Sequence, residues 1–274
     1  MAISADQNMA GTVPALERAI AVLRYLEENL APSACTVSRI AAALGLHKST
    51  CSNILRTLEA AAFLEYDADA KAYRLGPELI GLGASAGSRR DSRQIELRHV
   101  EALVRDTGFS VVVFEQLPSS EFLIVAKVDS FRDIKVTIDV GQHFPPWAPA
   151  LARVAQAWRD RDGAAAYLKR WAARPTTPST ITDPAALMVE LDRVRARGYA
   201  VSIGEYYPAN TAISAPIFSP RDKRCRGICL VAFSAELERG RIAKVGEAVR
   251  ETARAITRAL GGVPPRPETA TARV

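Results

Sequence analysis

The sequence is poor in the residues that build metal and thiol-based sites, because its 274 residues include only four cysteines and three histidines. No two cysteines form a C-x-x-C pair, and Cys225 and Cys229 have no histidine between or beside them. Zinc sites need closely spaced cysteine and histidine ligands. We therefore expect no metal and no cofactor, and we interpret the cysteines as small core residues or surface thiols.

Signals for membranes, export and catalysis are also absent. No run of about eighteen apolar residues is present, so we expect no membrane span. Residues 1–11 lack the basic patch and apolar stretch of a signal peptide. No P-loop and no G-x-S-x-G motif occurs, and Gly81, Gly83 and Gly87 follow a predicted helix rather than the strand that a dinucleotide-binding loop requires. The sequence therefore predicts a cytoplasmic protein that is not an enzyme; an enzyme acting on a small acid is the least favoured hypothesis.

Charge is unevenly distributed along the chain. The formal net charge is +6, which favours a nucleic-acid partner. Residues 1–80, however, carry seven Lys and Arg against nine Asp and Glu, a net charge of −2, which leaves +8 for the remainder. The basic surplus therefore lies outside the N-terminal part, so support for DNA binding has to come from the local pattern of residues.

The N-terminal part has the element order of a winged helix-turn-helix. After a first amphipathic helix, Thr36 is a good N-cap for a second helix, which Gly45 ends. A third helix is predicted at about 47–61, and strands follow at 63–66 and 71–75. Helix, helix, short turn, helix and hairpin, in that order, predict this fold.

The rest of the chain is of mixed type. After a helix that starts at Pro77, strand-like and helix-like runs do not alternate one for one, which argues against a doubly wound sheet. We expect an α+β arrangement, a mostly antiparallel sheet with helices. The predicted strands are 110–116, 121–129, 134–140, 199–203, 213–219 and 227–234, and the predicted helices are 95–107, 149–159, 163–171, 184–197 and 237–260.

The chain length fits two domains. We expect disordered tails at 1–11 and 262–274, a winged helix-turn-helix domain at 12–80, a linker at 81–92 and a second domain at 93–261.

The third helix carries the residues that we expect to contact DNA. Ser49, Ser52, Asn53 and Arg56 recur at helical spacing opposite an apolar face, and no acidic residue lies within 36–58. The N-terminal residues of such a helix reach base edges in the major groove, and flanking basic residues contact phosphates. Base or near-base contacts are predicted for Ser49, Thr50 and Asn53. Phosphate contacts are predicted for Thr36, Arg39, Lys48 and Arg56, for His47 unless it caps the helix, and for Lys71, Tyr73 and Arg74 in the wing.

Several long segments resemble the IclR family of bacterial transcription regulators, from about Val13 to Gly261. They include PALERAIAVLRYLEEN, TVSRIAAALGLHKSTCSNILRTLEAAAFLEYDADAKAYRLGPEL, GQHFPPWAPALARVAQAW and RGICLVAFSA. The resemblance implies a GAF-like effector-binding domain, dimers joined through the DNA-binding half, tetramers in some cases, and control by small organic acids or aromatic compounds.

The resemblance also places an effector pocket on three segments. They carry Phe144, Trp147, Ala148, Ala150 and Leu151, then Glu205, Ala212 and Ser214, then Val231 and Phe233. The family often has a histidine at Trp147, and a small hydroxyl or cysteine at Ala212, Val231 and Phe233. This pocket would be more apolar and aromatic, which favours an aromatic acid over a two- or three-carbon acid. In the alternative interpretation, Trp147 and Phe233 pack the core and Glu205 is a surface carboxylate.

The favoured hypothesis is a sequence-specific DNA-binding regulator, repressor or activator. It would act as a homodimer or tetramer on a palindromic operator, with a small organic acid as its effector. The alternative is a small-molecule sensor that acts through protein–protein contacts, which the net charge of −2 in residues 1–80 favours.

Overall fold

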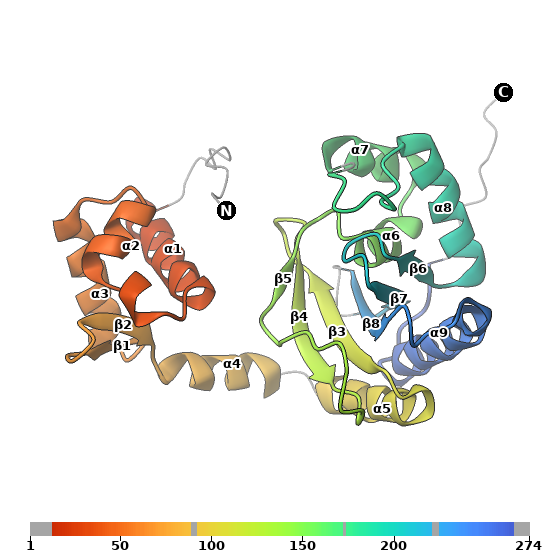
Figure 1. Cartoon of the computed structure of the whole chain (residues 1–274), viewed down its shortest axis with the longest axis horizontal. Coiled ribbons are helices and arrows are strands. Elements are labelled where there is room, and N and C mark those ends of the chain that lie inside the picture. Colours follow the sequence, from red (N-terminus) through yellow and green to blue (C-terminus); the bar gives the residue numbers. More distant parts are fainter. Residues whose placement is uncertain (1–12, 89–91, 172–173, 221–224, 266–274) are drawn as a thin grey trace. The chain divides into compact units, whose positions relative to one another are not determined.

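The computed structural model describes residues 13–88, 92–171, 174–220 and 225–265. The predicted tails at 1–11 and beyond 265, and residues 89–91 of the predicted linker, lie outside the described residues. The chain forms two compact units, residues 1–90 and 91–274 (Figure 1).

Unit 1 is a winged helix-turn-helix, as the sequence predicts. The Thr36 Oγ1 accepts a hydrogen bond from the Arg39 N–H at 3.4 Å and so caps the second helix, and Gly45 turns the chain with φ of +63°. The elements are α1 (Pro14–Glu28), η1 (Pro32–Ala34), α2 (Val37–Ala43), α3 (Lys48–Ala60), β1 (Leu64–Asp67), β2 (Ala72–Leu75) and α4 (Glu78–Ser88).

The core of unit 1 lies where α1, α2, α3 and the hairpin meet. It contains Val22, Leu26, Ile40, Cys51 and Leu55, all at most 3% exposed. The apolar periodicity of α1 extends beyond this core, because Leu16 and Ile20 are 62% and 55% exposed. Part of the apolar face of α1 is therefore not covered by the rest of unit 1.

Unit 2 is built around a six-stranded sheet. Its elements are α5 (Ser92–Thr107), β3 (Ser110–Gln116), β4 (Phe122–Val128), β5 (His143–Phe144), α6 (Pro149–Ala157), α7 (Arg161–Trp171), α8 (Pro184–Arg197), β6 (Ala200–Ile203), β7 (Asn210–Ile217), β8 (Arg226–Phe233), η2 (Arg239–Arg241) and α9 (Ile242–Ala259).

The sheet has the strand order β5-β4-β3-β8-β7-β6, and every pair is antiparallel. Helices α5 and α9 cover one face, and α6, α7 and α8 lie on the other (Figure 1). Strand β3 therefore alternates between two cores: Val111 and Val113 face α5 and α9, whereas Val112 and Phe114 face the α6 side. The prediction of an α+β fold with an antiparallel sheet is confirmed.

One predicted strand is wrong. Residues 134–140 have no strand partner; the paired segment is the two-residue β5, where Phe144 opposes Phe122. The alternation in the sequence has a different cause, because Val136 and Ile138 are half-buried against the sheet while their neighbours are exposed. Gly141, with φ of +95°, interrupts the backbone before β5. The segment packs by its side chains without joining the sheet.

The predicted linker at 81–92 is largely helical. Helix α4 continues to Ser88, and α5 begins at Ser92. Gly81 and Gly83 lie inside α4, where a Cβ would meet no atom within 4 Å. The glycines therefore weaken the helix signal in the sequence without ending the helix.

No helix in the described ranges is long and apolar enough to cross a bilayer. Among the same residues, no cluster of three or more His, Cys, Asp or Glu side chains is placed to hold a metal ion.

Candidate functional site

Helix α3 has one buried and one exposed face. Cys51 and Leu55 are fully buried against the core of unit 1. Ser49, Asn53 and Arg56 are exposed, and Ser52 and Thr50 are half-buried. The predicted polar stripe is therefore a real surface, and the side chains nearest the N-terminus of α3 lie on it.

The exposed face of α3 is internally ordered. The Arg56 Nη2 donates a hydrogen bond to the Asn53 Oδ1 at 2.9 Å, and the Thr57 hydroxyl donates to the Asn53 backbone carbonyl at 2.8 Å. The Asn53 amide nitrogen and the other Arg56 donors have no such partner on this helix face. Amide and guanidinium donors in this arrangement suit base edges and phosphates.

The start of α3 adds positive charge to this face. Arg39 of α2, together with Lys48 and His47, is exposed. His47 stands at the N-cap position of α3, but its side chain makes no capping hydrogen bond. Of the two roles predicted for His47, the cap is therefore not present, and the phosphate contact stays a prediction.

The wing is less suited to a phosphate backbone than the sequence suggests. Arg74 Nε forms an ion pair with the exposed Glu65 carboxylate at 2.7 Å. The tip is acidic as well: Asp67 Oδ1 accepts the N–H groups of Asp69 and Ala70, and Lys71 follows with φ of +51°. The positive side chains of the wing are thus offset by nearby carboxylates.

The structure does not favour the predicted DNA contact by Tyr73. Tyr73 is 7% exposed and belongs to the core of unit 1, with its ring 4.9 Å from that of Tyr66. Because side chains alternate along β2, either Tyr73 or Arg74 faces the core, and the aromatic ring does so.

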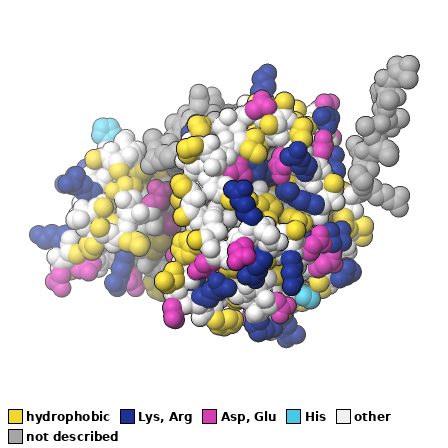
Figure 2. Space-filling view, turned by 45° about the vertical axis from the view of Figure 1, so that its right-hand side comes forward, with side chains coloured by type: hydrophobic (Ala, Val, Ile, Leu, Met, Phe, Trp, Pro, Cys, Tyr) yellow, Lys and Arg dark blue, Asp and Glu magenta, His cyan; other side chains and the backbone are white. Residues whose placement is uncertain are grey.

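The positive surplus of unit 2 does not form a single basic patch on the face that Figure 2 shows, where Lys and Arg side chains are interspersed with Asp and Glu. Many of these arginines make ion pairs, for example Arg250 and Arg254 with Glu251. The overall positive charge therefore does not identify a nucleic-acid surface on this unit.

Unit 2 contains a cavity of about 450 Å³ between the α6 face of the sheet and the segment 136–142. The sheet contributes mainly apolar walls, including Val112, Ile124 and Val231. The other residues that line the cavity are Val136, Thr137, Ile138, Gln142, Phe144, Ala148, Pro149, Ala150, Leu151, Ser202, Tyr206, Tyr207, Asn210, Ala212 and Cys229. The volume is that of a small-molecule site.

One wall of the cavity is aromatic. The ring centroid of Tyr206 lies 5.7 Å from that of Phe144 and 4.8 Å from that of Tyr207. Tyr206 is half-buried, and Tyr207 is 51% exposed. A flat ring stacks favourably in an edge-to-face or offset arrangement against such a wall.

The N-terminus of α6 lies at the cavity. Ala148 is the N-cap and offers no side-chain cap, and the first helical bond joins the Ala152 N–H to the Ala148 carbonyl at 2.8 Å. The N–H groups of Ala150 and Leu151 precede that bond, so they have no acceptor within the helix. Ala150 and Leu151 both line the cavity, which brings unpaired backbone donors to an otherwise apolar site.

The cavity is electrically neutral apart from these amides. Among the described residues that line it, none is Lys, Arg, His, Asp or Glu. Burial raises the pKa of the Cys229 thiol to about 11, against a smaller opposing effect of a hydrogen bond with Ser214. The pKa of Tyr206 is also raised, mainly by burial and to a smaller extent by the neighbouring Tyr207. Both groups are therefore uncharged at neutral pH.

The structure places six of the ten predicted effector residues around this cavity: Phe144, Ala148, Ala150, Leu151, Ala212 and Val231. It places Trp147 elsewhere, in a small separate pocket with the Arg174 guanidinium 4.7 Å from its ring centroid. Phe233 lies past the end of the cavity, beside Arg132 and Glu236.

Glu205 and Ser214 are also not cavity residues. Glu205 is 5% exposed and binds the Arg153 guanidinium, so it is neither a pocket carboxylate nor a surface one. Ser214 is fully buried beneath the sheet surface opposite Cys229.

The sequence does not predict the other twelve of the eighteen residues that line the cavity. Ser202 lies opposite Ala212 across β6 and β7, so its place follows from the strand register alone. Tyr206 and Tyr207 directly follow Glu205, and an adjacent pair of tyrosines after a predicted strand was the available signal. The sequence predicts a strand over Val136 and Ile138, and this strand does not form.

Two protein-family models match the chain. The IclR helix-turn-helix domain matches residues 15–68, and the bacterial transcriptional regulator IclR C-terminal domain matches residues 84–258. The two matches follow each other along most of the chain and correspond to the two units of the fold.

Several relatives match over nearly their whole lengths. The glycerol operon regulatory protein of Streptomyces coelicolor is 34% identical over 264 residues, which cover 92% of this chain and 98% of that protein. A crystal structure of an IclR transcriptional regulator from Alicyclobacillus acidocaldarius superposes with a TM-score of 0.82 at 29% identity, over 92% of this chain and all of that one. An IclR homologue from Microbacterium hydrocarbonoxydans complexed with 4-hydroxybenzoate shares the fold, with a TM-score of 0.76 at 22% identity over 90% of this chain and 99% of that one.

Proposed function

Because the chain belongs to the IclR family of bacterial transcription regulators, which bind DNA through their helix-turn-helix, we propose that a small aromatic acid in the cavity of unit 2 modulates its binding to an operator. The observation that carries this proposal is the pairing of an apolar, aromatic cavity of about 450 Å³ with the uncapped N-terminus of α6. The two features correspond to the two ends of such a ligand.

The N-terminus of α6 suits the carboxylate end of the ligand. A helix N-terminus attracts anions through its unpaired N–H groups and its dipole. With no basic side chain among the described lining residues, the amides of Ala150 and Leu151 are the donors on offer to a carboxylate. Cys229 and Tyr206, both neutral, add no repulsion.

The walls of the cavity suit the ring end of the ligand. Phe144, Tyr206 and Tyr207 form an aromatic surface, and Val112, Ile124 and Val231 are aliphatic. A two- or three-carbon acid would leave most of this apolar surface without a partner, whereas a six-membered ring would cover more of it. The 4-hydroxybenzoate complex of the Microbacterium homologue supports this ligand class.

For the DNA-binding half we propose that α3 enters the major groove. In this proposal Ser49, Thr50, Ser52 and Asn53 lie at base edges. Phosphates would be contacted by Thr36, Arg39, His47, Lys48 and Arg56, and more weakly by Lys71 and Arg74. A homodimer would place two such helices on a palindrome with half-sites about 34–36 Å apart. The exposed Leu16 and Ile20 of α1 support self-association through unit 1, because they form an uncovered apolar stripe.

Two measurements on the full chain test the proposal. Thermal shift is measured with 4-hydroxybenzoate and pyruvate, and a ligand at about a hundredfold excess over its Kd stabilises by about 2.7 kcal/mol. Gel shift is then measured on DNA from upstream of the gene, with and without the acid that binds. We expect a shift with the aromatic acid and an acid-dependent change in DNA binding. Absence of any sequence preference over random duplex would sink the operator proposal. Acid binding without DNA binding would instead favour a sensor that acts through protein contacts.

A further inference from the structure

A buried ion pair joins α6 to the chain segment that carries the aromatic wall. Arg153 of α6 is 3% exposed and Glu205 is 5% exposed. The Arg153 Nη1 donates to the Glu205 Oε1 at 2.7 Å, and the Nη2 donates to the Glu205 Oε2. The contact is a two-point fork, which fixes direction as well as distance.

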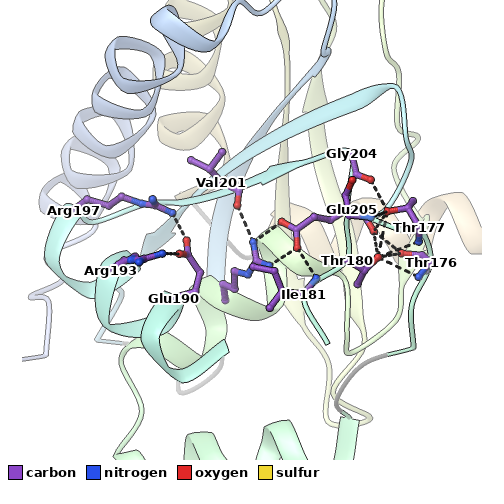
Figure 3. Close-up of polar contacts among 12 residues, drawn as sticks. Thr176, Thr177, Thr180, Ile181, Glu190, Arg193, Arg197, Val201, Gly204 and Glu205 are labelled. Carbon is purple, nitrogen blue, oxygen red and sulfur yellow. Dashed lines mark hydrogen bonds and ion pairs between the residues drawn. The ribbon is translucent and has the colours of Figure 1, made fainter. Parts of the chain in front are cut away.

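The same pair holds two further segments in place. The Arg153 Nη1 also donates to the Val201 carbonyl of β6 at 2.8 Å, and the Ile181 N–H donates to the Glu205 Oε2 at 3.3 Å. The Glu205 backbone carbonyl accepts from the hydroxyls of Thr176 and Thr180 at 2.6 and 2.7 Å (Figure 3). Helix α6 and the segment 176–181, which lie apart in the sequence, therefore both bind Glu205.

Glu205 begins the loop that forms the cavity wall. The loop, residues 204–210, is closed by a bond from the Gly204 N–H to the Asn210 carbonyl at 2.8 Å. Gly204 has φ of +63°, and a Cβ there would lie 3.0 Å from the Pro208 carbonyl oxygen. Tyr206 and Tyr207 follow immediately, so Glu205 holds the backbone directly before both rings.

The ion pair between Arg153 and Glu205 is not explained by a contribution to folding stability alone. Buried pairs recover their desolvation cost only when every polar atom is satisfied. The Arg153 Nε is buried without a hydrogen-bond partner among the described residues. A two-point contact that leaves one buried donor unpaired fixes the relative positions of its two residues but adds little to the free energy of folding.

We propose that Arg153 and Glu205 are positioning residues that hold the Tyr206–Tyr207 wall at a fixed distance from the N-terminal amides of α6 and so select flat aromatic acids over short aliphatic ones. This rests on the proposed function, because it concerns the same cavity. Arg153 lies one helical turn beyond Ala150, so the fork ties the wall to the helix close to the proposed carboxylate site.

The test uses the full chain with Arg153→Met and Glu205→Gln combined, which removes both charges without leaving one of them buried and unpaired. The control combines Arg161→Met and Asp192→Asn, an exposed pair on α7 and α8 at 3.5 Å. Hydrogen–deuterium exchange without ligand reports on the loop. Calorimetric titration with 4-hydroxybenzoate and with pyruvate reports on selection. Should the double variant lose its circular dichroism signal, Arg153→Lys replaces it, because lysine keeps the charge but not the fork.

We expect exchange over 204–210 to be about tenfold faster in the Arg153 and Glu205 variant, with α5 and α9 unchanged. Its affinity for 4-hydroxybenzoate should fall about tenfold and that for pyruvate by less than about threefold. Unchanged exchange over 204–210 overturns the proposal, and so does an equal loss of affinity for both acids. If the wild type binds neither acid, the proposed ligand class fails, and the exchange comparison alone then decides on the positioning role.

Discussion

The Arg56 Nη2 donates a hydrogen bond to the Asn53 Oδ1 at 2.9 Å on the exposed face of α3. The contact holds a guanidinium and an amide side by side, one helical turn apart. In the proposed DNA interface, each side chain would therefore lose less conformational freedom on binding than it would alone.

Arg56→Ala should weaken binding to the operator and to random duplex alike and reduce the salt dependence of binding, because we propose that Arg56 contacts a phosphate. The measurement is Kd by fluorescence anisotropy on the operator and on random duplex, at two salt concentrations. A contact to a base edge would instead weaken binding to the operator alone, by about 1–3 kcal/mol. Arg74→Ala is the control, because Arg74 is already paired with Glu65, and it should weaken binding less than Arg56→Ala does. An equal effect of the two substitutions would contradict this prediction.

Tyr73 gives a prediction about the wing. Tyr73→Phe should leave DNA affinity unchanged, because the ring packs in the core of unit 1 and does not reach the surface. Tyr73→Ala should lower the free energy of unfolding of unit 1 by about 3 kcal/mol through the cavity that it creates. Chemical denaturation followed by circular dichroism measures the second effect. Reduced DNA binding by a fully folded Tyr73→Phe protein would restore the tyrosine to the interface.

The cavity gives a third prediction. Ala212→Leu adds side-chain volume at a half-buried lining position and should occupy space that the ring needs. We expect the thermal shift with 4-hydroxybenzoate to disappear, while DNA binding without acid stays at the wild-type level. The control is Ala243→Leu, at an exposed position of α9. Ala126→Leu would not serve as a control, because Ala126 is buried in the other core. A persisting shift in Ala212→Leu would place the ligand elsewhere.

Cys229 gives a prediction about pH. Burial raises its pKa from 9.0 to about 11, so the folded protein keeps a proton that the unfolded chain loses. The stability linked to this proton is complete below pH 9 and is lost as the pH rises to about 11, a loss of about 2–3 kcal/mol. The melting temperature of unit 2 should therefore fall more steeply with pH above pH 9 in the wild type than in Cys229→Ala. Val231→Ala, which also empties cavity-lining volume but does not titrate, should keep the wild-type slope. Equal slopes in all three proteins would contradict the raised pKa.

The sequence predicts unit 1 well because local signals determine it. Thr36 caps α2, Gly45 takes the left-handed turn, and the apolar spacing of Cys51 and Leu55 orients α3. The burial of Tyr73 could not be predicted, because alternation in a four-residue strand does not say which face lies inside.

The cavity is harder to predict because it depends on long-range pairing. Glu205 is a candidate pocket group by its type, yet its partner Arg153 is 52 residues away and takes it out of the cavity. Trp147 directly precedes the N-cap of α6, but its ring packs beneath Arg174. The strand prediction at 134–140 fails because alternation reports burial on one side and not the presence of a hydrogen-bonding neighbour.

Every residue of α6 is buried, from Pro149 to Ala157. A helix enclosed on all sides tolerates few replacements, whereas Tyr207 and much of the segment 136–142 are exposed to solvent. Changing the ligand preference of this protein by directed evolution, for example to build a biosensor, should therefore succeed mainly through substitutions at 136–142 and 206–207. Libraries targeted to α6 would yield mostly unfolded proteins, and the acid-binding end of the cavity would stay constant while the ring-binding end diversifies.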